Sequence, residues 1–209
     1  MTKHLFITAT NTNIGKTYAA CKILEYLGNS GVKIGACKPI ETGVANIPQD
    51  AKRLLDVCKK YNNNFKNLTP FDITAYTFSL PAAPYSADTN GIIDIEKIKN
   101  KIQELSKLCD YLIIEGAGGL YVPIKENYFM IDLIKELNCQ TLLITPSHLG
   151  CINETLLSIK ALESYNISYK WCVNLYKDKD SFKKTTKPFY DAYFKEWFEF
   201  DEILSTLKV

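Results

Sequence analysis

The sequence has no long hydrophobic segment. No run of about 18 apolar residues, the length that spans a bilayer, occurs along the chain. The first apolar run, Leu5-Phe6-Ile7, is too short for the core of a signal peptide. Internal repeats, low-complexity tracts and Pro/Gly-rich linkers are also missing. We therefore expect a single domain over residues 1–209, with no membrane partner.

The sequence also lacks paired cysteine motifs and an excess of charge. Its seven cysteines include no C-x-x-C pair, which favours reduced thiols packed as small hydrophobes in a cytoplasmic protein. The net charge of +2 gives no general attraction to nucleic acid, so we expect no such partner. A hydrophobic fraction of 46% and a charged fraction of 23% exclude disordered and fibrous classes.

Short apolar runs bounded by Gly, Pro or Asn alternate with segments of helical periodicity. Strands buried on both faces of a parallel sheet are expected at residues 5–7, 32–37, 111–114, 141–144 and 171–173. Helices are expected at residues 16–27, 95–105 and 152–163. Gly28 and Gly31 would stop the first helix, and Asp94 would cap the second. This alternation predicts a three-layer α/β fold, with a mostly parallel central sheet flanked by helices.

A phosphate-binding loop is expected where the first strand ends. Gly15-Lys16-Thr17 lies between this strand and a helix, as in a P-loop, whose backbone N–H groups cradle phosphates. Lys16 would reach the β- and γ-phosphates, and the Thr17 hydroxyl would bind Mg²⁺. Thr10 replaces the first glycine of the strict motif, so an ordinary capped turn is the alternative. The pattern favours a P-loop NTPase-like fold.

A lysine follows the second apolar run. Lys38 opens the segment Lys38-Pro39-Ile40-Glu41-Thr42-Gly43, at the strand end where sites in such sheets lie. Beside a P-loop it could place a second cation on a transferring phosphoryl group. The alternative is a solvated strand end. We expect a lysine at a strand end to lie outside the core, so its replacement should hardly change folding.

Two acidic residues are candidates for a magnesium site. Glu115 directly follows a buried strand and precedes Gly116-Ala117-Gly118-Gly119, and a buried carboxylate needs a partner. Mg²⁺ is suited to this role because it takes one or two carboxylates together with phosphate oxygens. A lysine is the alternative partner. Asp50 begins a helical stretch, where it could hold the metal or act only as an N-cap.

These segments together resemble the dethiobiotin synthetase family. The matching segments, in family order, are Phe6–Thr17, Lys38–Gly43, Glu115–Gly119, Leu149–Asn153 and Val173-Asn174. The resemblance implies a homodimeric enzyme in which 7,8-diaminononanoate and CO₂ form a carbamate. ATP would phosphorylate the carbamate to a carbamic–phosphoric anhydride. The second amine would then close the ureido ring of dethiobiotin and release phosphate.

The resemblance also implies the site residues. Lys16, Lys38 and Thr12 would be catalytic, and Thr17, Asp50 and Glu115 would hold Mg²⁺. ATP would contact Asn13, Ile14, Gly15, Lys16, Thr17, Tyr18, Asp50, Glu115, Gly116, Ala117, Gly118, Asn174 and Leu175, with the Asn174 amide at the purine edge. The substrate would contact Thr12, Lys38, Thr42, Gly150, Cys151, Ile152 and Asn153. The last four would serve the neighbouring subunit's site, although they could also be a mere helix start.

The sequence departs from the family pattern in three places. Ala9 stands where relatives commonly have glycine, and Asn13 stands where an acidic residue is common. Residues 176–187 are polar and lysine-rich, where relatives have a segment that helps enclose the base. We expect a solvated loop there, weak base selectivity, and packing of the aromatic residues 189–198 on the core.

The main rival interpretation is a nucleotide-dependent switch of the ParA/MinD kind, which works by binding partners. Those proteins carry an extra lysine early in the loop, where this chain has Asn11. The ATP-using domain of a cobyrinic-acid-type amide synthetase would need a glutaminase domain as well. A simple kinase would leave the Gly150-Cys151-Ile152-Asn153 loop unexplained.

Overall fold

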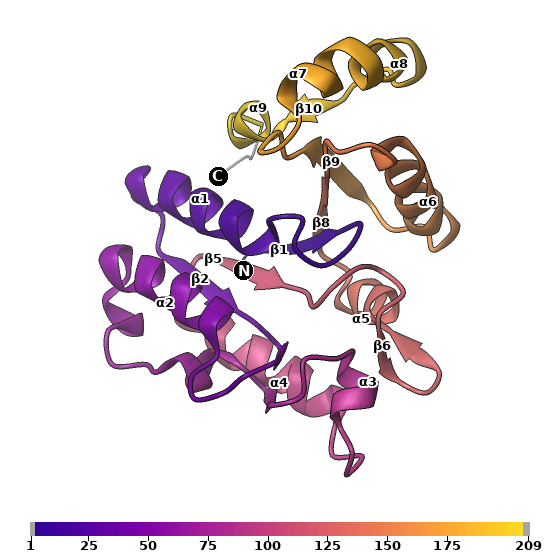
Figure 1. Ribbon diagram of the computed structural model, residues 1–209. Helices are drawn as coiled ribbons and strands as arrows, with labels where there is room; N and C mark the ends of the chain where they lie inside the picture. The colour runs from indigo at the N-terminus through magenta and orange to yellow at the C-terminus, as the bar shows by residue number, and fades with distance from the viewer. Residues whose placement is uncertain (1–2, 207–209) are drawn as a thin grey trace.

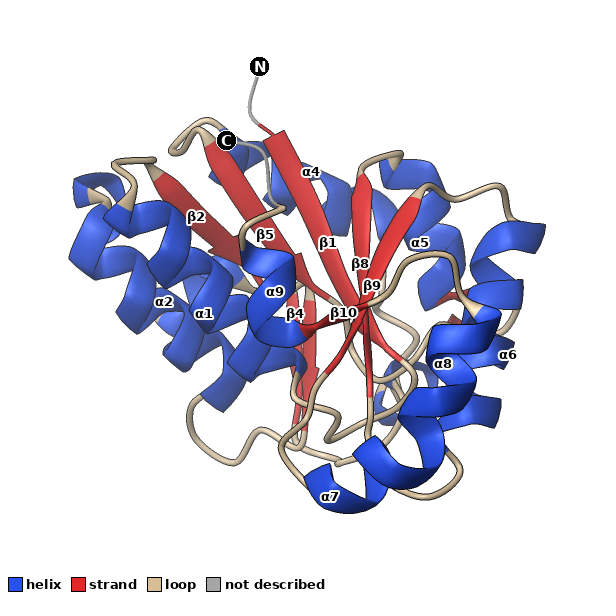
Figure 2. Cartoon of the chain, turned by 90° about the horizontal axis from the view of Figure 1, so that it is seen from above, coloured by secondary structure: helices blue, strands red, loops and turns tan. Residues whose placement is uncertain are grey.

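Six parallel strands form the centre of the structure, a computed structural model that describes residues 3–206 (Figure 2). In spatial order they are β10 (Phe198–Glu199), β9 (Tyr169–Val173), β8 (Gln140–Thr145), β1 (Lys3–Ala9), β5 (Tyr111–Glu115) and β2 (Ile34–Cys37). In this register Ile7 pairs with Glu115, and Cys37 pairs with Ile114. The carboxyl ends of β1, β5 and β2 therefore meet along one edge of the sheet.

Helices cover both faces of this sheet (Figures 1 and 2). The longer ones are α1 (Lys16–Asn29), α2 (Gln49–Tyr61), α4 (Ile95–Ser106), α5 (Met130–Leu137) and α6 (Cys151–Ser164). α1, α2 and the short α9 (Phe200–Leu204) lie on one side, and α4, α5 and α6 lie on the other. The predicted three-layer α/β fold is confirmed, since the central strands are buried from both faces.

Two small sheets and several short helices complete the fold. β3 (Ile40–Thr42) pairs in parallel with β4 (Tyr76–Phe78), and β6 (Pro123–Lys125) pairs antiparallel with β7 (Tyr128–Phe129). The short helices are α3 (Pro84–Ala87), α7 (Lys179–Ser181), α8 (Lys187–Tyr193) and the single turns 63–65 and 70–73. The sequence patterns singled out neither small sheet, because such short strands carry no periodic signal.

Element boundaries differ from the sequence prediction by one or two residues, as the second strand and the first helix illustrate. The second strand begins at Ile34 rather than at residue 32, and the first helix continues through Gly28 to Asn29. Gly28 is therefore not a stop signal. It lies where α1 packs on α2, and a Cβ there would collide with the Tyr61 ring. Gly31, with a φ of +82°, follows the helix end as expected.

The segment after β9 is helical, so the prediction of a solvated loop at residues 176–187 is wrong. α7 leads into a π-helical turn at residues 182–186 and then into α8. Phe182 and Thr186 are buried, which is why the segment folds onto the core, whereas Lys183 and Lys184 remain exposed. The expected aromatic packing is confirmed, because the ring of Tyr190 is fully buried.

No helix within residues 3–206 is long and apolar enough to cross a membrane.

Candidate nucleotide and substrate site

The loop between β1 and α1 has the shape of a P-loop. Gly15 has a φ of +97°, which favours glycine, and a Cβ there would collide with the Asn174 side chain. The Lys16 Nζ donates a 2.8 Å hydrogen bond to the Asn11 carbonyl. The Asn174 amide donates to the Ile14 carbonyl at 2.9 Å. The loop is thus closed around a space into which backbone N–H groups can point.

Asn174 has a different contact from the one expected at a purine edge. Its amide nitrogen donates to the Ile14 carbonyl. The Asn174 side chain is buried and is hydrogen-bonded to the phosphate loop. Tyr176, two residues later, donates from its hydroxyl to the Asn13 carbonyl at 3.1 Å. The end of β9 therefore supports the second half of the phosphate loop.

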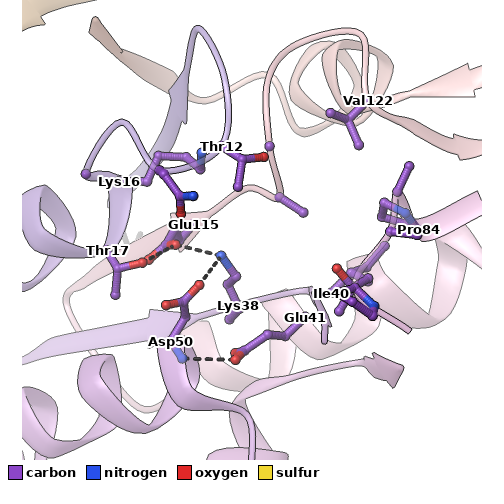
Figure 3. A pocket seen from close by; sticks show the side chains of 18 of the residues that line it. Thr12, Lys16, Thr17, Lys38, Ile40, Glu41, Asp50, Pro84, Glu115 and Val122 are labelled. Atoms are coloured by element: carbon purple, nitrogen blue, oxygen red, sulfur yellow. Dashed lines mark hydrogen bonds and ion pairs between the residues drawn. The ribbon is translucent and has the colours of Figure 1, made fainter. Parts of the chain in front are cut away.

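Lys38 lies between two carboxylates at the centre of the site (Figure 3). Its Nζ is 2.6 Å from Glu115 Oε1 and 3.3 Å from Asp50 Oδ2. It also donates to the Gly116 carbonyl at 3.2 Å, and the Thr17 hydroxyl donates to Glu115 Oε1 at 2.8 Å. This is the lysine pairing of Glu115 that the sequence left open as an alternative.

The expectation that Lys38 lies outside the core is wrong, and so is the alternative of a solvated strand end. Its side chain is only 4% exposed, because β2 ends beneath the loop that follows β5. Burial alone would lower the pKa of Lys38, but the Glu115 and Asp50 carboxylates outweigh it and raise that pKa. Lys38 therefore stays charged, and its charge is matched within the site.

Lys16 has the opposite electrostatic balance. Burial and, after it, the positive charge of Lys38 lower its pKa to about 8, with partial compensation from Glu115 and Asp50. The ammonium has a neutral carbonyl as its hydrogen-bond acceptor. A phosphate group beside Lys16 would favour its charged form.

Asp50 is not the N-cap of its helix. α2 begins one residue earlier, at Gln49, and the free N–H groups of Asp50 and Ala51 donate to the Glu41 carboxylate at 3.0 and 2.9 Å. Glu41 thus takes the capping role from outside the helix. This leaves the Asp50 carboxylate free to turn toward Lys38.

The carboxylates and hydroxyl at this edge fit a magnesium ion. Glu115 Oε2 is buried and has no hydrogen-bond partner among the described residues. The Glu115 carboxylate contacts both the Thr17 hydroxyl and the Lys38 ammonium, and the Asp50 carboxylate contacts the same ammonium. Within residues 3–206, no group of three or more His, Cys, Asp or Glu could form an all-protein metal site. Such a partial donor set suits Mg²⁺, which also takes phosphate oxygens and water.

A cavity of about 680 Å³ joins these groups. Predicted residues that line it are Thr12, Asn13, Gly15, Lys16, Thr17, Tyr18, Lys38, Thr42, Asp50, Glu115, Ala117 and Gly118. Predicted residues outside its lining are Ile14, Gly116, Gly150, Cys151, Ile152, Asn153, Asn174 and Leu175. The fold therefore brings the phosphate loop, the second-strand lysine and the acidic pair around one space.

Several lining residues escaped sequence reasoning. They include Glu41, Arg53, Val122 and the segment Pro81–Pro84. Arg53 is the only arginine in the sequence and follows Asp50 by one helical turn, a signal that was available. Pro81–Pro84 lies far along the chain from any motif, so only the tertiary fold could reveal it.

The loop at residues 149–153 lies apart from the cavity. Gly150 has a φ of +95° and precedes α6, while the Cys151 side chain is buried and lies 3.9 Å from the Thr186 hydroxyl. The Leu149 side chain is 99% exposed. Within one chain, the structure does not bring these predicted substrate contacts into the lining of the cavity.

The fold and the loop define a P-loop nucleotide-binding α/β protein. A profile of the AAA domain family matches residues 3–174. The structure resembles a plasmid partition protein from Borrelia burgdorferi, with a TM-score of 0.58 and 12% identity, over 98% of this chain and 97% of that one. It also resembles the MinD cell division protein of Aquifex aeolicus, with a TM-score of 0.51 and 18% identity, over 90% and 77% of the two chains. At these identities the likeness is one of fold.

Curated sequences place the chain more narrowly. An ATP-dependent dethiobiotin synthetase BioD from Sulfurovum sp. (strain NBC37-1) is 57% identical over 193 residues, 92% of each chain. Its counterpart from Wolinella succinogenes is 39% identical over 208 residues, 98% of this chain and 96% of that one. The chain belongs to the ATP-dependent dethiobiotin synthetase family. The resemblance seen in the sequence motifs is thereby confirmed.

Proposed function

We propose that the protein makes dethiobiotin from 7,8-diaminononanoate, CO₂ and ATP, with release of ADP and phosphate. The observation that carries this proposal is the joining of the phosphate loop, Lys38 and Glu115 around one cavity. Identity of 57% to a curated dethiobiotin synthetase supports the same reaction. The chemistry needs a phosphoryl donor and a carbamate acceptor in contact, and a shared cavity provides this.

Two lysines stabilise the charge that moves during phosphoryl transfer. Lys16, at the start of α1, binds the β- and γ-phosphates, whose negative charge favours the ammonium form that burial disfavours. Lys38 lies beneath the same space and offsets negative charge on the carbamate and the transferring group. Thr12 and Thr42 line the cavity and orient the carbamate or the diamine through their hydroxyls.

Mg²⁺ would be held by Thr17, Asp50 and Glu115. When bound, it would neutralise charge on the phosphate oxygens. The unpartnered Glu115 Oε2 supports this placement, because a buried carboxylate oxygen without a partner is costly. Lys38 contacts the same two carboxylates and would share them with the cation.

The nucleotide lies along the loop and the start of α1. The backbone of the loop at residues 13–15 faces the phosphates, and Tyr18 follows on α1, with Ala117 and Gly118 across the cavity. Asn174 supports the loop through its bond to the Ile14 carbonyl, and neither Asn174 nor Leu175 lines the cavity. The Asn174 amide keeps only part of its hydrogen-bonding capacity for a purine.

The protein acts as a homodimer in which residues 150–153 complete the neighbouring subunit's site. Their separation from their own chain's cavity supports this arrangement, as do the exposed side chains of Leu149 and Leu157 nearby. The substrate's distal carboxylate would meet N–H groups at the start of α6. Light scattering of the purified protein should give twice the chain mass, and Leu157→Asp should lower it. A monomeric wild-type protein with full activity would contradict a shared site.

We further infer a single domain that works in the cytoplasm without nucleic acid or membrane. The unbroken packing of residues 3–206 around one sheet supports the first inference, and the free thiols support the second. The net charge of +2 supports the absence of nucleic-acid binding.

The reaction is tested by mixing the protein with diaminononanoate, labelled bicarbonate and Mg-ATP, and counting acid-stable label. A free carbamate loses CO₂ in acid, whereas a closed ureido ring keeps it. We expect stable label that requires both ATP and the diamine. No stable label, with ATP hydrolysis that needs no diamine, would instead support a nucleotide-dependent switch.

A further inference from the structure

A carboxylate on α6 contacts the phosphate loop from outside the cavity. Glu154 Oε2 accepts a 3.0 Å hydrogen bond from the Thr10 hydroxyl, across 144 positions of sequence. Glu154 lies in the first turn of α6, immediately after residues 150–153. We propose that Glu154 is a positioning residue that sets the conformation of the loop's first half, and with it the place of the Thr12 hydroxyl.

Thr10 directly follows β1, and its N–H, its hydroxyl and its carbonyl each contact another part of the fold. Its N–H donates to the Ile144 carbonyl at 3.2 Å, and its hydroxyl donates to Glu154. Its carbonyl lies so close beneath Gly119 that a Cβ there would stand 2.8 Å from the oxygen. The Glu154 bond is the side-chain contact that orients this residue, since the other two constrain only its backbone.

The residues that follow Thr10 carry the chemistry and have few anchors of their own. Asn11 and Thr12 are exposed, and the Asn11 side chain accepts a 2.7 Å bond from the Thr12 N–H within the same turn. The Asn11 carbonyl is also the acceptor for Lys16 Nζ. A shift of Thr10 would therefore move both the Thr12 hydroxyl and the Asn11 carbonyl that accepts the Lys16 hydrogen bond.

The two halves of the loop are held by different parts of the fold. Asn174 and Tyr176, after β9, bind the carbonyls of Ile14 and Asn13. Glu154 holds the first half at Thr10. The carboxylate is favourably placed in the first turn of a helix, and His148 Nε2 lies 3.7 Å from its other oxygen. The start of α6 is therefore linked directly to the phosphate loop.

The test compares Glu154→Ala, Glu154→Gln and Thr10→Val with Glu163→Ala. Glu163 lies at the far end of α6, where it pairs with Lys160 at 2.7 Å and does not contact the loop. Amide hydrogen exchange, followed by mass spectrometry, reports the mobility of residues 10–18 without requiring turnover. We expect faster exchange there in Glu154→Ala and Thr10→Val, near-normal exchange in Glu154→Gln, and no change in Glu163→Ala.

The kinetic predictions rest on the proposed function. Glu154→Ala should lower kcat about tenfold with little change in the KM for ATP, since a misplaced Thr12 affects the reacting geometry more than nucleotide binding. Glu154→Gln should restore most of kcat because it keeps an acceptor oxygen. The Thr10→Val/Glu154→Ala double variant should be no worse than the worse single variant.

Unchanged exchange in residues 10–18 of Glu154→Ala would overturn the proposal. Faster exchange spread equally over the whole chain would also overturn it, because the role would then be general stability. Failure of the wild-type protein to form acid-stable product would refute the proposed reaction, while the exchange measurement would still decide the role of Glu154.

Discussion

Lys38 shows how one side chain can serve stability and chemistry at the same position. Its ammonium is 2.6 Å from Glu115 Oε1, and the Glu115 side chain is 0% exposed. A buried ion pair of this kind adds little net stability, but removing one partner leaves an uncompensated charge. The same placement puts the lysine under the phosphate loop, where a cation can follow the transferring group.

Replacing Lys38 with alanine should therefore have two effects. We expect kcat to fall by about 10² or more, the scale of losing one preorganised charge contact. We also expect the free energy of unfolding to fall by about 3 kcal/mol, because Glu115 is left unpaired. Urea unfolding and steady-state assays measure the two effects. Adding Glu115→Gln should recover part of the stability but no activity, and a fully stable Lys38→Ala protein would contradict the buried pair.

Lys38 also competes with the cation that the carboxylates would bind. In Lys38→Ala, Glu115 and Asp50 lose the charge between them, so Mg²⁺ without nucleotide should stabilise this variant more than the wild type. A concentration ten times the dissociation constant should raise Tm by about 4 °C. Differential scanning calorimetry with and without EDTA measures the shift. An equal shift in Lys38→Ala/Glu115→Gln would place the cation elsewhere.

At the scale of elements, the contact between α1 and α2 positions the two halves of the site. α1 carries Lys16 and Thr17 at its start, and α2 carries Asp50, so the closeness of the helices sets the distance between these groups. Gly28 permits the approach, because a Cβ there would collide with the Tyr61 ring. Glu41 holds the start of α2 in place.

Gly28→Ala should destabilise the protein in spite of alanine's higher helix propensity. The propensity gain is about 1 kcal/mol, whereas forcing a methyl group into packed contact costs about 2 kcal/mol. Chemical denaturation measures the balance. The loss should shrink in a Tyr61→Leu background, where the ring is gone. Stabilisation by Gly28→Ala in the wild-type background would show that the helices are not closely packed there.

The helical segment after β9 bears on base selectivity. Lys183 and Lys184 are exposed, and the Asn174 amide is already bonded to the Ile14 carbonyl. Few fixed donors and acceptors remain to distinguish one base edge from another. We expect kcat/KM for ATP to exceed that for GTP and CTP by less than about a hundredfold. Competition assays with the three nucleotides decide this, and a larger preference would refute the prediction.

At the scale of the whole molecule, most cysteines are packed inside the protein and the polar site lies at the carboxyl edge of the sheet. Five of the seven cysteines are buried, and Cys21 and Cys139 are half-buried. Burial raises the pKa of Cys139 to about 11 and that of Cys21 and Cys109 to about 12. A raised pKa keeps a thiol protonated at neutral pH, so these cysteines are expected to pack rather than react.

Alkylation should therefore be slow in the folded protein. At pH 8 a thiol with a pKa of 11 is about 10⁻³ ionised, so labelling of Cys139 by iodoacetamide should be far slower than in urea and should speed up as pH rises. Mass spectrometry of labelled peptides measures the rates. Rapid labelling of Cys21, Cys109 or Cys139 in the native state would show that these side chains are accessible.

Much of the fold followed from the sequence because its signals are local. Apolar runs and helical periodicity placed five strands and three helices, and the motif Gly15-Lys16-Thr17 marked the loop between the first strand and helix. The two-residue strand β10 and the two small sheets escaped because they are too short to show a period. Gly28 was misinterpreted as a stop signal because its requirement comes from another helix.

The sequence by itself determined the family, the order of strands and helices along the chain, and the residue types that meet at the carboxyl edge. Only the tertiary structure decided the pairing of these groups. Lys38 with Glu115, Glu41 with the start of α2, and Glu154 with Thr10 are contacts between elements. Periodicity and turn chemistry act between neighbours in the chain, whereas the partner of a buried charge depends on which strands and helices pack together.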